Sequence, residues 1–361
     1  MRRLRILHVP HTVGGHPQGL ARAERELGHD SHSVALWASA FAYPVDEVLR
    51  DEATNRFVFE LRRAKLLARA LRWADVVHFN FGSSIVPRAL RNIDLPLLRR
   101  AGKVVAVTFQ GDDARLGAEV RARGGLSLPS ALPERYGPDG DATRRAVIRR
   151  FARHAHLVYY LNPDLAVGLP GRARFVPYAH VDPRQWEPLR RHERAAGAVR
   201  ILHAPSDREV KGTRHIEEAV AQLRAEDLDV ELMLVENMRH DEARRAYVHA
   251  DIAVDQLYAG WYGGFAVEAM ALGLPVVAHI RDEDLPGVPE ELHAQLPVLR
   301  ATPDTLRDVL AGLLSPLLRE EAASRSRPFV ERWHDPREIA KLVVDDYQSV
   351  LAAPRRSSIL R

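Results

Sequence analysis

Short apolar runs alternate with longer amphipathic stretches along the whole chain. In the first half, the runs are rich in β-branched and aromatic residues, which is typical of strands buried on both faces of a parallel sheet. They are LRILHVP, HSVALW, DVVHFNF, KVVAVTF, HLVYYLN and ARFVPYA. The stretches between them have helical periodicity, for example LARAEREL, FVFELRRAKLLARALRW and IVPRALRNI. This alternation predicts βαβ units, with helices on both faces of a parallel sheet.

The same pattern begins again after residue 198. The strand-like runs are VRILHAP, VELMLVEN, DIAVDQL and PVVAHI, and helical stretches include RHIEEAVAQLRAE, LPVLRATPDTLRDVLAGLLSPLL and EIAKLVVDDYQSVLA. Segment 181–198 between the two series is charged and contains two prolines, which is typical of a linker. We therefore predict two doubly wound, Rossmann-like α/β domains facing each other across a cleft. They cover residues 1–180 and 199–336, and a terminal helix and tail cover 337–361.

The composition narrows the classes of protein to consider. With 46% apolar and 28% charged residues the chain has an ordinary soluble balance. It has no cysteine, which excludes disulfides and thiolate metal sites, and its 17 histidines show no metal-ligand spacing. No apolar run approaches the ~20 residues of a membrane-spanning helix. The opening MRRLRILHVPHTVGG has basic residues and then an apolar run that is too short for a signal peptide's core, so it is interpreted as a first strand and its loop. We expect a cytoplasmic protein without a metal ion.

Charge is distributed unevenly between the two halves. Residues 1–178 hold 28 Lys and Arg against 17 Asp and Glu, a net +11, whereas residues 179–361 hold 24 against 31, a net −7. This split supports two domains and indicates that the first half meets an anionic partner. We expect no nucleic-acid partner. One helical stripe has cations spaced i, i+3, i+7 and i+10, at Arg62, Lys65, Arg69 and Arg72. Two interpretations stay open: a solvated face, or peripheral contact with an anionic membrane at its inner face.

The segment 260–277, GWYGGFAVEAMALGLPVV, contains a strand-to-helix turn with a carboxylate one helical turn later. Gly263 and Gly264 follow a strand and open a helix, which is where open α/β sheets bind ligands. Glycines there let backbone N–H groups approach an anion at the helix start. Glu268 is then within reach of the hydroxyls of a ligand. The alternative is that Glu268 pairs with a neighbouring arginine.

A second loop of the same kind follows the first strand of the second domain. In APSDREVKGTRHIEEAV, Arg208 and Lys211 precede a helix. Two cations beside free N–H groups form a good diphosphate site. The alternative is a solvated loop, in which such residues are common.

The first domain offers two further candidate segments at strand ends. Gly14 and Gly15 follow its first strand, but the sequence GGHPQG lacks the G-x-G-x-x-G fingerprint of dinucleotide binding. No phosphate-binding G-x-x-x-x-G-K-[ST] motif occurs either. Asp112 and Asp113 follow a later strand in VTFQGDDARL. Because adjacent side chains of an extended segment point to opposite sides, we predict that one faces a substrate hydroxyl and the other caps the turn.

Taken in order, these segments resemble the GT-B glycosyltransferases, and are most similar to family 4 of the nucleotide-sugar-dependent enzymes. The resemblance rests on Gly14–Gly15, on VKG at 210–212, on FAVEAMALGLPVV at 265–277 and on the terminal helix ending in DDYQSVLA. It implies that the second domain holds a nucleotide diphosphate sugar, that the first holds the acceptor, and that the terminal helix crosses back to the first domain.

The resemblance also assigns roles to single residues. Glu268 matches the second Glu of the family's E-x7-E motif, which implies a contact with the ribose hydroxyls. Lys211 matches the lysine that stabilises the leaving diphosphate. The sequence departs from the pattern at Gly260, where the first Glu is expected, and at Ser206, where an Arg is usual. The acceptor segment that often carries a histidine reads QGDD, and Arg208 is the candidate substitute for the missing Arg.

The resulting hypothesis is transfer of a sugar, with retention, to a glycan, a lipid-linked glycan or a small molecule. No cofactor or metal is expected beside the nucleotide sugar. The predicted site consists of catalytic Lys211, Arg208 and Asp112, donor-binding Glu268, Gly263, Gly264, Phe265 and Ser206, and acceptor-side Gly14, Gly15 and Asp113. Two alternatives stay open within this fold: a catalytically inactive sugar-nucleotide-binding protein and a nucleotide-sugar epimerase. The missing fingerprint disfavours an NAD-linked oxidoreductase.

Overall fold

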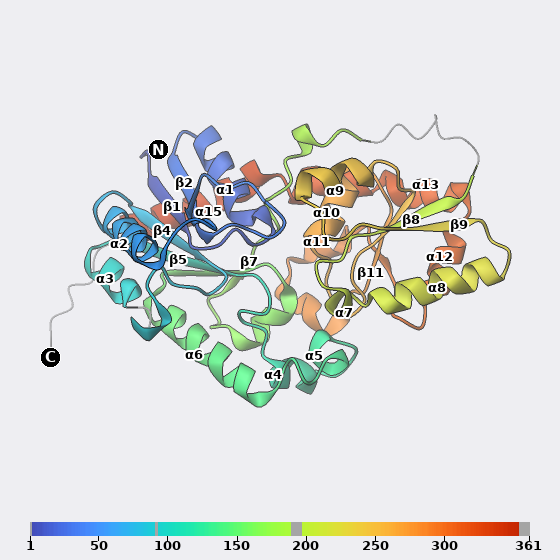
Figure 1. Cartoon of the computed structure of the whole chain (residues 1–361), viewed down its shortest axis with the longest axis horizontal. Helices are drawn as coiled ribbons and strands as arrows, with labels where there is room; N and C mark the ends of the chain where they lie inside the picture. The colour runs from blue at the N-terminus through green and yellow to red at the C-terminus, as the bar shows by residue number, and fades with distance from the viewer. Residues whose placement is uncertain (1, 91–92, 189–196, 354–361) are drawn as a thin grey trace.

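The computed structural model describes residues 2–90, 93–188 and 197–353, which form two α/β units joined side by side (Figure 1). The first unit is built on a parallel sheet with the strand order β3-β2-β1-β4-β5-β6-β7. Its strands are β1 (Arg5–Val9), β2 (Asp30–Trp37), β3 (Glu47–Arg50), β4 (Val76–Asn80), β5 (Val104–Phe109), β6 (Leu157–Tyr160) and β7 (Arg174–Phe175).

Helices connect these strands and cover both faces of the sheet. They are α1 (His16–Glu26), α2 (Arg56–Arg72), α3 (Asp94–Arg100), α4 (Gly117–Ala122), α5 (Leu128–Ala131) and α6 (Pro138–His154), with short 3₁₀ turns η1 (Val13–Gly15), η2 (Arg88–Leu90), η3 (Pro163–Gly168) and η4 (Pro183–Gln185). The central strands β1, β4, β5 and β6 are almost wholly buried, as their continuous apolar runs require, whereas the edge strands β3 and β7 are partly exposed.

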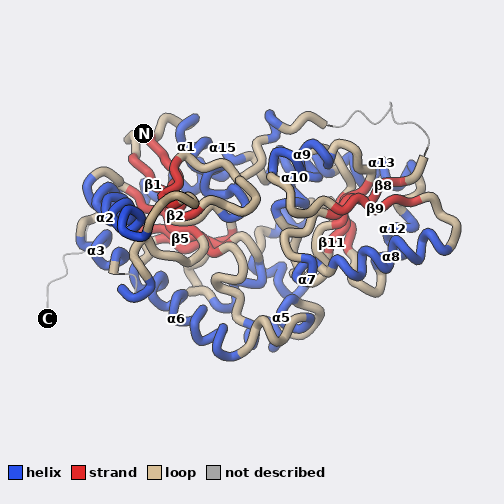
Figure 2. Tube along the Cα trace, in the orientation of Figure 1, coloured by secondary structure: helices blue, strands red, loops and turns tan. Residues whose placement is uncertain are grey.

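The second unit has a smaller parallel sheet with the strand order β12-β11-β10-β8-β9. Its strands are β8 (Val199–His203), β9 (Val230–Leu234), β10 (Ile252–Val254), β11 (Val276–Ala278) and β12 (Leu299–Arg300). Its helices are α7 (Arg208–Lys211), α8 (Thr213–Ala225), α9 (His240–Tyr247), α10 (Gly264–Ala271), α11 (Glu290–Ala294), α12 (Leu306–Gly312), α13 (Pro316–Ser324) and α14 (Ser326–Trp333), with the 3₁₀ turn η6 (Asp282–Gly287). Figure 2 shows the two sheets in separate halves of the molecule.

The last helix, α15 (Pro336–Ala352), returns to the first unit, as Figure 1 shows by its position beside α1. Its apolar face is buried in a cluster with residues of β1 and α1; from α15 the cluster holds Ile339, Ala340, Val343, Val344 and Tyr347. The Tyr347 hydroxyl lies 2.6 Å from Nδ1 of His78 on β4. The predicted crossing of the terminal helix to the first domain is therefore confirmed.

Two parts of the predicted pattern are wrong in detail. The segment IVPRALRNI (85–93) was predicted as a helix, but its described residues before position 91 form a loop and the turn η2, residues 91–92 lie outside the described part of the chain, and the helix α3 begins at Asp94. The Asp94 carboxylate accepts hydrogen bonds from the Ser84 hydroxyl and the Ile85 N–H, which closes the loop and replaces helical hydrogen bonds. Within the predicted helix LPVLRATPDTLRDVLAGLLSPLL, Leu299–Arg300 instead pair with β11 as an edge strand. The predicted linker 181–198 lies partly outside the described residues, at 189–196, and so does 354–361 of the predicted tail.

The two units contact each other directly, through side chains beside the strand ends that face one another. Tyr160 donates a hydrogen bond to the carbonyl of Gly287 at 2.7 Å. Arg281, of which 2% is exposed, donates to the carbonyl of Val120 across the boundary. Arg123 forms an ion pair with Asp284 at 3.1 Å. These contacts hold the units together and place the carboxyl ends of their sheets on opposite walls of one cavity.

Candidate functional site

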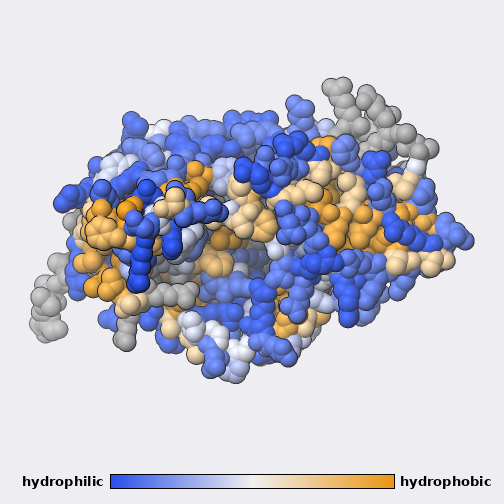
Figure 3. All heavy atoms as spheres, in the orientation of Figure 1, coloured by the Kyte–Doolittle hydropathy of each residue, from blue (hydrophilic) through white to orange (hydrophobic). Residues whose placement is uncertain are grey.

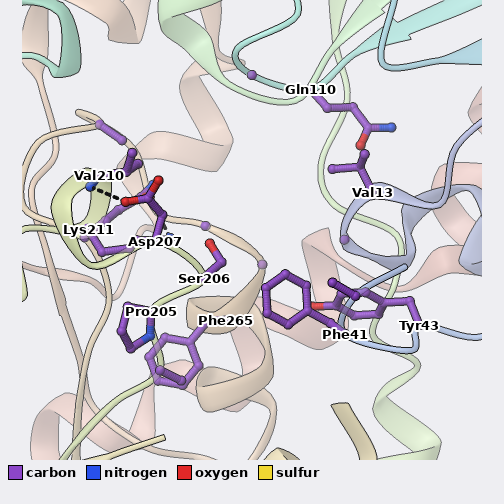
Figure 4. A pocket seen from close by; sticks show the side chains of 18 of the residues that line it. Val13, Phe41, Tyr43, Gln110, Pro205, Ser206, Asp207, Val210, Lys211 and Phe265 are labelled. Atoms are coloured by element: carbon purple, nitrogen blue, oxygen red, sulfur yellow. Dashed lines mark hydrogen bonds between the residues drawn. The ribbon is translucent and has the colours of Figure 1, made fainter. Parts of the chain in front are cut away.

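A cavity of about 510 Å³ lies between the two units. From the first unit, the residues after β1, β4 and β5 line it, including Val13, Phe81 and Gln110. From the second unit, the residues after β8, β9 and β10 line it, including Val235 and Gln256. Figure 4 shows the two walls, with Lys211 and Ser206 on one side and Val13 and Gln110 on the other. The cavity is thus placed where parallel α/β sheets bind ligands, at the carboxyl ends of their strands.

Most of the predicted site residues line this cavity. From the second unit they are Ser206, Lys211, Gly263, Gly264, Phe265 and Glu268, and from the first unit Gly14 and Asp112. Arg208, Gly15 and Asp113 are not among the lining residues. The sequence motifs therefore locate the cavity. Whether a given side chain points into it depends on the residues with which that side chain forms hydrogen bonds or ion pairs.

Glu268 is buried on α10 and holds two imidazoles rather than an arginine. Its Oε1 lies 2.7 Å from Nε2 of His240 and 3.4 Å from Nε2 of His180. Burial alone would raise the pKa of this carboxyl group, but the interactions with His180 and His240 outweigh burial and lower its pKa to about 2. Glu268 is therefore an ionised hydrogen-bond acceptor in the cavity wall.

Lys211 ends the short helix α7 and points into the cavity. The Asp207 carboxylate caps this helix by accepting hydrogen bonds from the N–H groups of residues 209 and 210. The Lys211 ammonium donates to Asp255 Oδ1 at 2.9 Å and to Gln256 Oε1 at 2.7 Å. Asp255 also accepts a hydrogen bond from the N–H of Gly263. That N–H group, which the sequence assigned to an anion, is thus engaged within the protein.

Arg208 is not brought together with Lys211. It begins α7, and its guanidinium pairs with Glu236 at 2.7 Å and with Glu217 of α8. These carboxylates draw it away from the cavity, although Lys211 is only three residues further on. The predicted pair of cations at the end of β8 is therefore not formed in this structure.

Asp112 and Asp113 lie in different surroundings. Asp113 accepts hydrogen bonds from the N–H groups of Gln110 and Gly111, and burial raises its pKa to about 7. It closes the turn and lies outside the cavity. Asp112 lines the cavity and accepts hydrogen bonds from Arg115 at 2.6 Å, Tyr136 at 2.6 Å and Arg135 at 3.1 Å. Burial alone would raise its pKa, but these partners lower it.

Gly15 has a packing role that its sequence did not reveal. It lies in the left-handed region with φ of +69°, and a Cβ atom there would come within 3.0 Å of the Tyr43 ring and 3.3 Å of His180 Cβ. A Cβ on Gly264 would come within 3.3 Å of the His180 ring. One glycine of each predicted pair therefore makes room for side chains around Glu268.

Sequence reasoning missed several residues that line the cavity or contact its lining residues. Asp255 and Gln256 could have been found, because they are the polar residues of the run DIAVDQL and directly follow the strand β10, whose end faces the cavity. Arg135 could not, because nothing in a loop sequence indicates that its guanidinium bridges Asp112 and, at 2.8 Å, Asp207 of the other unit. Tyr43, His180 and His240 were missed for the same reason, because they meet only after folding.

The basic side chains that line the cavity are paired with carboxylates. Lys211 pairs with Asp255, His240 with Glu268, Arg135 with Asp112 and Asp207, and Arg115 with Asp112 and Asp164. An anionic ligand would compete with these carboxylates for the cations. Among the described residues, no group of three or more His, Asp or Glu side chains is arranged to hold a metal ion. Nor is any described helix long and apolar enough to cross a membrane.

Known structures share this architecture, although no protein-family model and no curated protein sequence matches the chain. Sucrose-phosphate synthase from Thermosynechococcus elongatus superposes with a TM-score of 0.64 at 17% identity, over 98% of this chain and 100% of that one. HepE of Anabaena, in complex with UDP and glucose, superposes with a TM-score of 0.62 at 14% identity, over 96% of this chain and 100% of that one. The catalytic domain of starch synthase IV from Arabidopsis thaliana, bound to ADP and acarbose, gives a TM-score of 0.60 at 10% identity, over 98% and 100%. The chain therefore has the GT-B fold, as its sequence predicted.

Proposed function

We propose that the protein transfers a sugar from a nucleotide diphosphate sugar to a hydroxyl group of an acceptor. The observation that carries this proposal is the cavity between the units, which brings Lys211 and Glu268 opposite Asp112 and Gly14. HepE and starch synthase IV, which share the fold, were solved with UDP and with ADP, and this supports a nucleoside diphosphate as the leaving group.

The chemistry divides between the two walls. Glu268 accepts hydrogen bonds from the ribose hydroxyls, and Lys211 stabilises the negative charge that develops on the departing diphosphate. The bond between the anomeric carbon and the phosphate oxygen breaks, and a bond to the acceptor oxygen forms. The acceptor's proton leaves with the diphosphate or to solvent. Asp112, whose pKa is lowered, orients the acceptor hydroxyl as a hydrogen-bond acceptor. Contact between the units keeps water from the donor.

Three finer features belong to the same proposal. The reaction needs no metal, so EDTA leaves turnover unchanged. The transfer retains the anomeric configuration. NMR of the product formed from a donor of known anomeric configuration tests this. The protein belongs to family 4 of the GT-B enzymes, a prediction that rests on the motif at 265–277 and on Lys211.

Thermal unfolding in the presence of nucleotides tests the function. We expect UDP, ADP or GDP, or the matching nucleotide sugar, to raise the melting temperature with a preference for one base. A ligand at a hundred times its Kd adds about 2.7 kcal/mol to native stability, which shifts a domain of this size by about 5 °C or more. NAD serves as the control ligand and should produce no shift.

Turnover assays then separate the alternatives. If nucleoside diphosphate is released only when an acceptor is present, the proposal is supported. Binding without turnover, with every acceptor class supplied, indicates an inactive sugar-nucleotide-binding protein. Conversion of the nucleotide sugar without an acceptor indicates an epimerase. A shift with NAD alone contradicts the proposal and favours an oxidoreductase.

We also propose that the first unit contacts an anionic membrane through α2 and α3. The two helices pack against each other and expose Phe57, Leu61, Leu90, Ile93 and Leu97 on and beside them. Phe57 is 79% exposed. Figure 3 shows apolar side chains gathered over α2 and α3. Helix α2 contains six Lys and Arg residues and one Glu. This combination of apolar and cationic residues suits an anionic lipid surface.

The structure refines the predicted cationic stripe on α2. Arg62 donates to the carbonyl of Leu49 and Arg69 pairs with Glu47, so both are engaged within the protein. Exposed Arg56, Lys65 and Arg72 are the side chains proposed to meet lipid headgroups.

Sedimentation with lipid vesicles checks this contact. We expect the protein to bind phosphatidylcholine vesicles that contain phosphatidylglycerol but not phosphatidylcholine alone, and added salt should weaken binding. The double variant Phe57→Ser/Leu61→Ser should lose binding. Leu317→Ser is the matched control, because Leu317 is 74% exposed on α13 of the other unit. Equal binding by the double variant, or self-association through this face in ultracentrifugation, contradicts the proposal.

A further inference from the structure

The segment 38–46, between β2 and β3 of the first unit, reaches across the cavity to the second unit. The carbonyl of Phe41 accepts a hydrogen bond from the His240 N–H, at the start of α9, at 2.9 Å. The Tyr43 ring lies against the His240 imidazole, with 4.6 Å between the ring centroids and 35° between the planes. Both Phe41 and Tyr43 line the cavity, and Figure 4 shows Tyr43 reaching from the first unit toward Phe265. The first unit therefore touches His240 through both backbone and side chain.

His240 in turn holds Glu268. Its Nε2 lies 2.7 Å from Glu268 Oε1. Burial alone would lower the pKa of this imidazole, but the hydrogen bond to Glu268 outweighs burial and raises it. His180, which also belongs to the first unit, approaches the same oxygen at 3.4 Å. Both imidazoles meet Oε1, and no hydrogen bond within the described part of the chain involves Oε2. One carboxylate oxygen is thus fixed by the protein, and the other can accept from a ligand.

The packing leaves little room for other arrangements of these rings. A side chain on Gly15 would collide with Tyr43, and one on Gly264 would press against His180. His240 also contacts a second aromatic ring, that of Trp186, with ring centroids 6.3 Å apart. The imidazole of His240 therefore contacts two aromatic rings, and one of them, that of Tyr43, is supplied by a loop of the opposite unit.

We propose that the first unit completes the ribose subsite of the second: Tyr43 and Phe41 fix His240, and His240 orients the Glu268 carboxylate toward the ribose hydroxyls. The inference rests on the proposed function, because it takes a nucleoside diphosphate as the ligand. Tyr43 and His240 are then positioning residues. Tight recognition of ribose requires the two units to be in contact, so the unit that holds the acceptor also controls how firmly the donor is held.

Calorimetric titration with ribose-modified nucleotides tests this inference. UDP and ADP are compared with their 2′,3′-dideoxy forms, which lack both hydroxyls, in the full-length protein. For the base that binds, we expect the wild-type protein to favour the normal nucleotide by about a hundredfold, because the dideoxy form loses two hydrogen bonds to a charged group. In Tyr43→Ala and His240→Ala, this preference should fall at least tenfold, while affinity for the dideoxy form changes little.

Two further variants separate positioning from folding. Tyr43→Phe keeps the ring and should keep the ribose preference. Tyr258→Ala removes a different tyrosine that contacts a histidine, His215, outside the cavity, and should keep the preference as well. A general loss of structure would weaken the binding of the normal and the dideoxy nucleotide equally, so the ratio of their two affinities would stay unchanged.

The outcomes distinguish this inference from the proposed function. If the wild-type protein binds no nucleotide, the proposed function fails. If it binds nucleotide without a ribose preference, or if Tyr43→Ala keeps the full preference, the proposed function stands and the inference is overturned. A lower preference in both alanine variants, with Tyr43→Phe and Tyr258→Ala unchanged, supports it.

Discussion

Replacing Glu268 with glutamine is expected to lower nucleotide affinity about a hundredfold or more, because two charge-assisted hydrogen bonds of roughly 1.5 kcal/mol each are lost. The substitution preserves shape and volume but removes the negative charge that lies against His240 and is proposed to bind the ribose hydroxyls. The pKa of about 2 means that the native carboxylate is ionised throughout the neutral range. Calorimetric titration with the nucleotide that stabilises the wild-type protein measures it.

Glu24 provides a matched control for this substitution. It is a fully buried glutamate on α1 that also holds a histidine, with 2.9 Å between its Oε2 and Nε2 of His8, and it does not line the cavity. Glu24→Gln disturbs a similar buried pair, so a fall in melting temperature with unchanged nucleotide affinity is expected. If Glu24→Gln weakens nucleotide binding as much as Glu268→Gln does, the effect is general destabilisation and the ribose role of Glu268 is wrong.

Much of the fold could be predicted because its signals are local and repeated. Buried parallel strands need continuous apolar runs, and each helix between them shows a 3.6-residue period. The return of α15 followed from the family resemblance, and its buried face explains why it docks. The errors arose where a single side chain decides the local structure. The Asp94 carboxylate closes the loop before α3, and no periodic pattern reveals such a bond.

The residues of the candidate site likewise divide into those with a local sequence signal and those without one. Lys211 and Glu268 were found because each follows a strand end within a recognisable motif. Arg208 was placed beside Lys211 because sequence distance was taken for spatial distance, whereas Glu217 and Glu236 hold it elsewhere. Tyr43 carries no local signal at all, because its partner His240 is nearly two hundred residues away and in the other unit. Contacts between units can be predicted only once the relative placement of the units is known.

Replacing Lys211 with methionine is expected to lower kcat by about 10² to 10³, the usual cost of losing one donor that stabilises charge in the transition state. The ammonium is fixed by Asp255 and Gln256, which directly follow β10, so it does not need to be reorganised when the diphosphate departs. Because charge builds up mainly as the bond breaks, KM should change much less than kcat. Steady-state kinetics with the identified donor and acceptor measure both constants.

Arg208→Ala is the control that separates the structure from the sequence prediction. Both cations were predicted to hold the diphosphate, but only Lys211 lines the cavity, so Arg208→Ala should leave kcat within about twofold, as for a surface substitution. Methionine at 211 also leaves Asp255 buried without its cation, which costs stability. The double variant Lys211→Met/Asp255→Asn removes that unpaired charge and restores folding without restoring catalysis.

If Arg208→Ala lowers kcat as much as Lys211→Met, the loop 206–213 rearranges on binding and the sequence prediction of two phosphate-binding cations is right. If the double variant recovers activity together with stability, the lysine serves the fold rather than the chemistry.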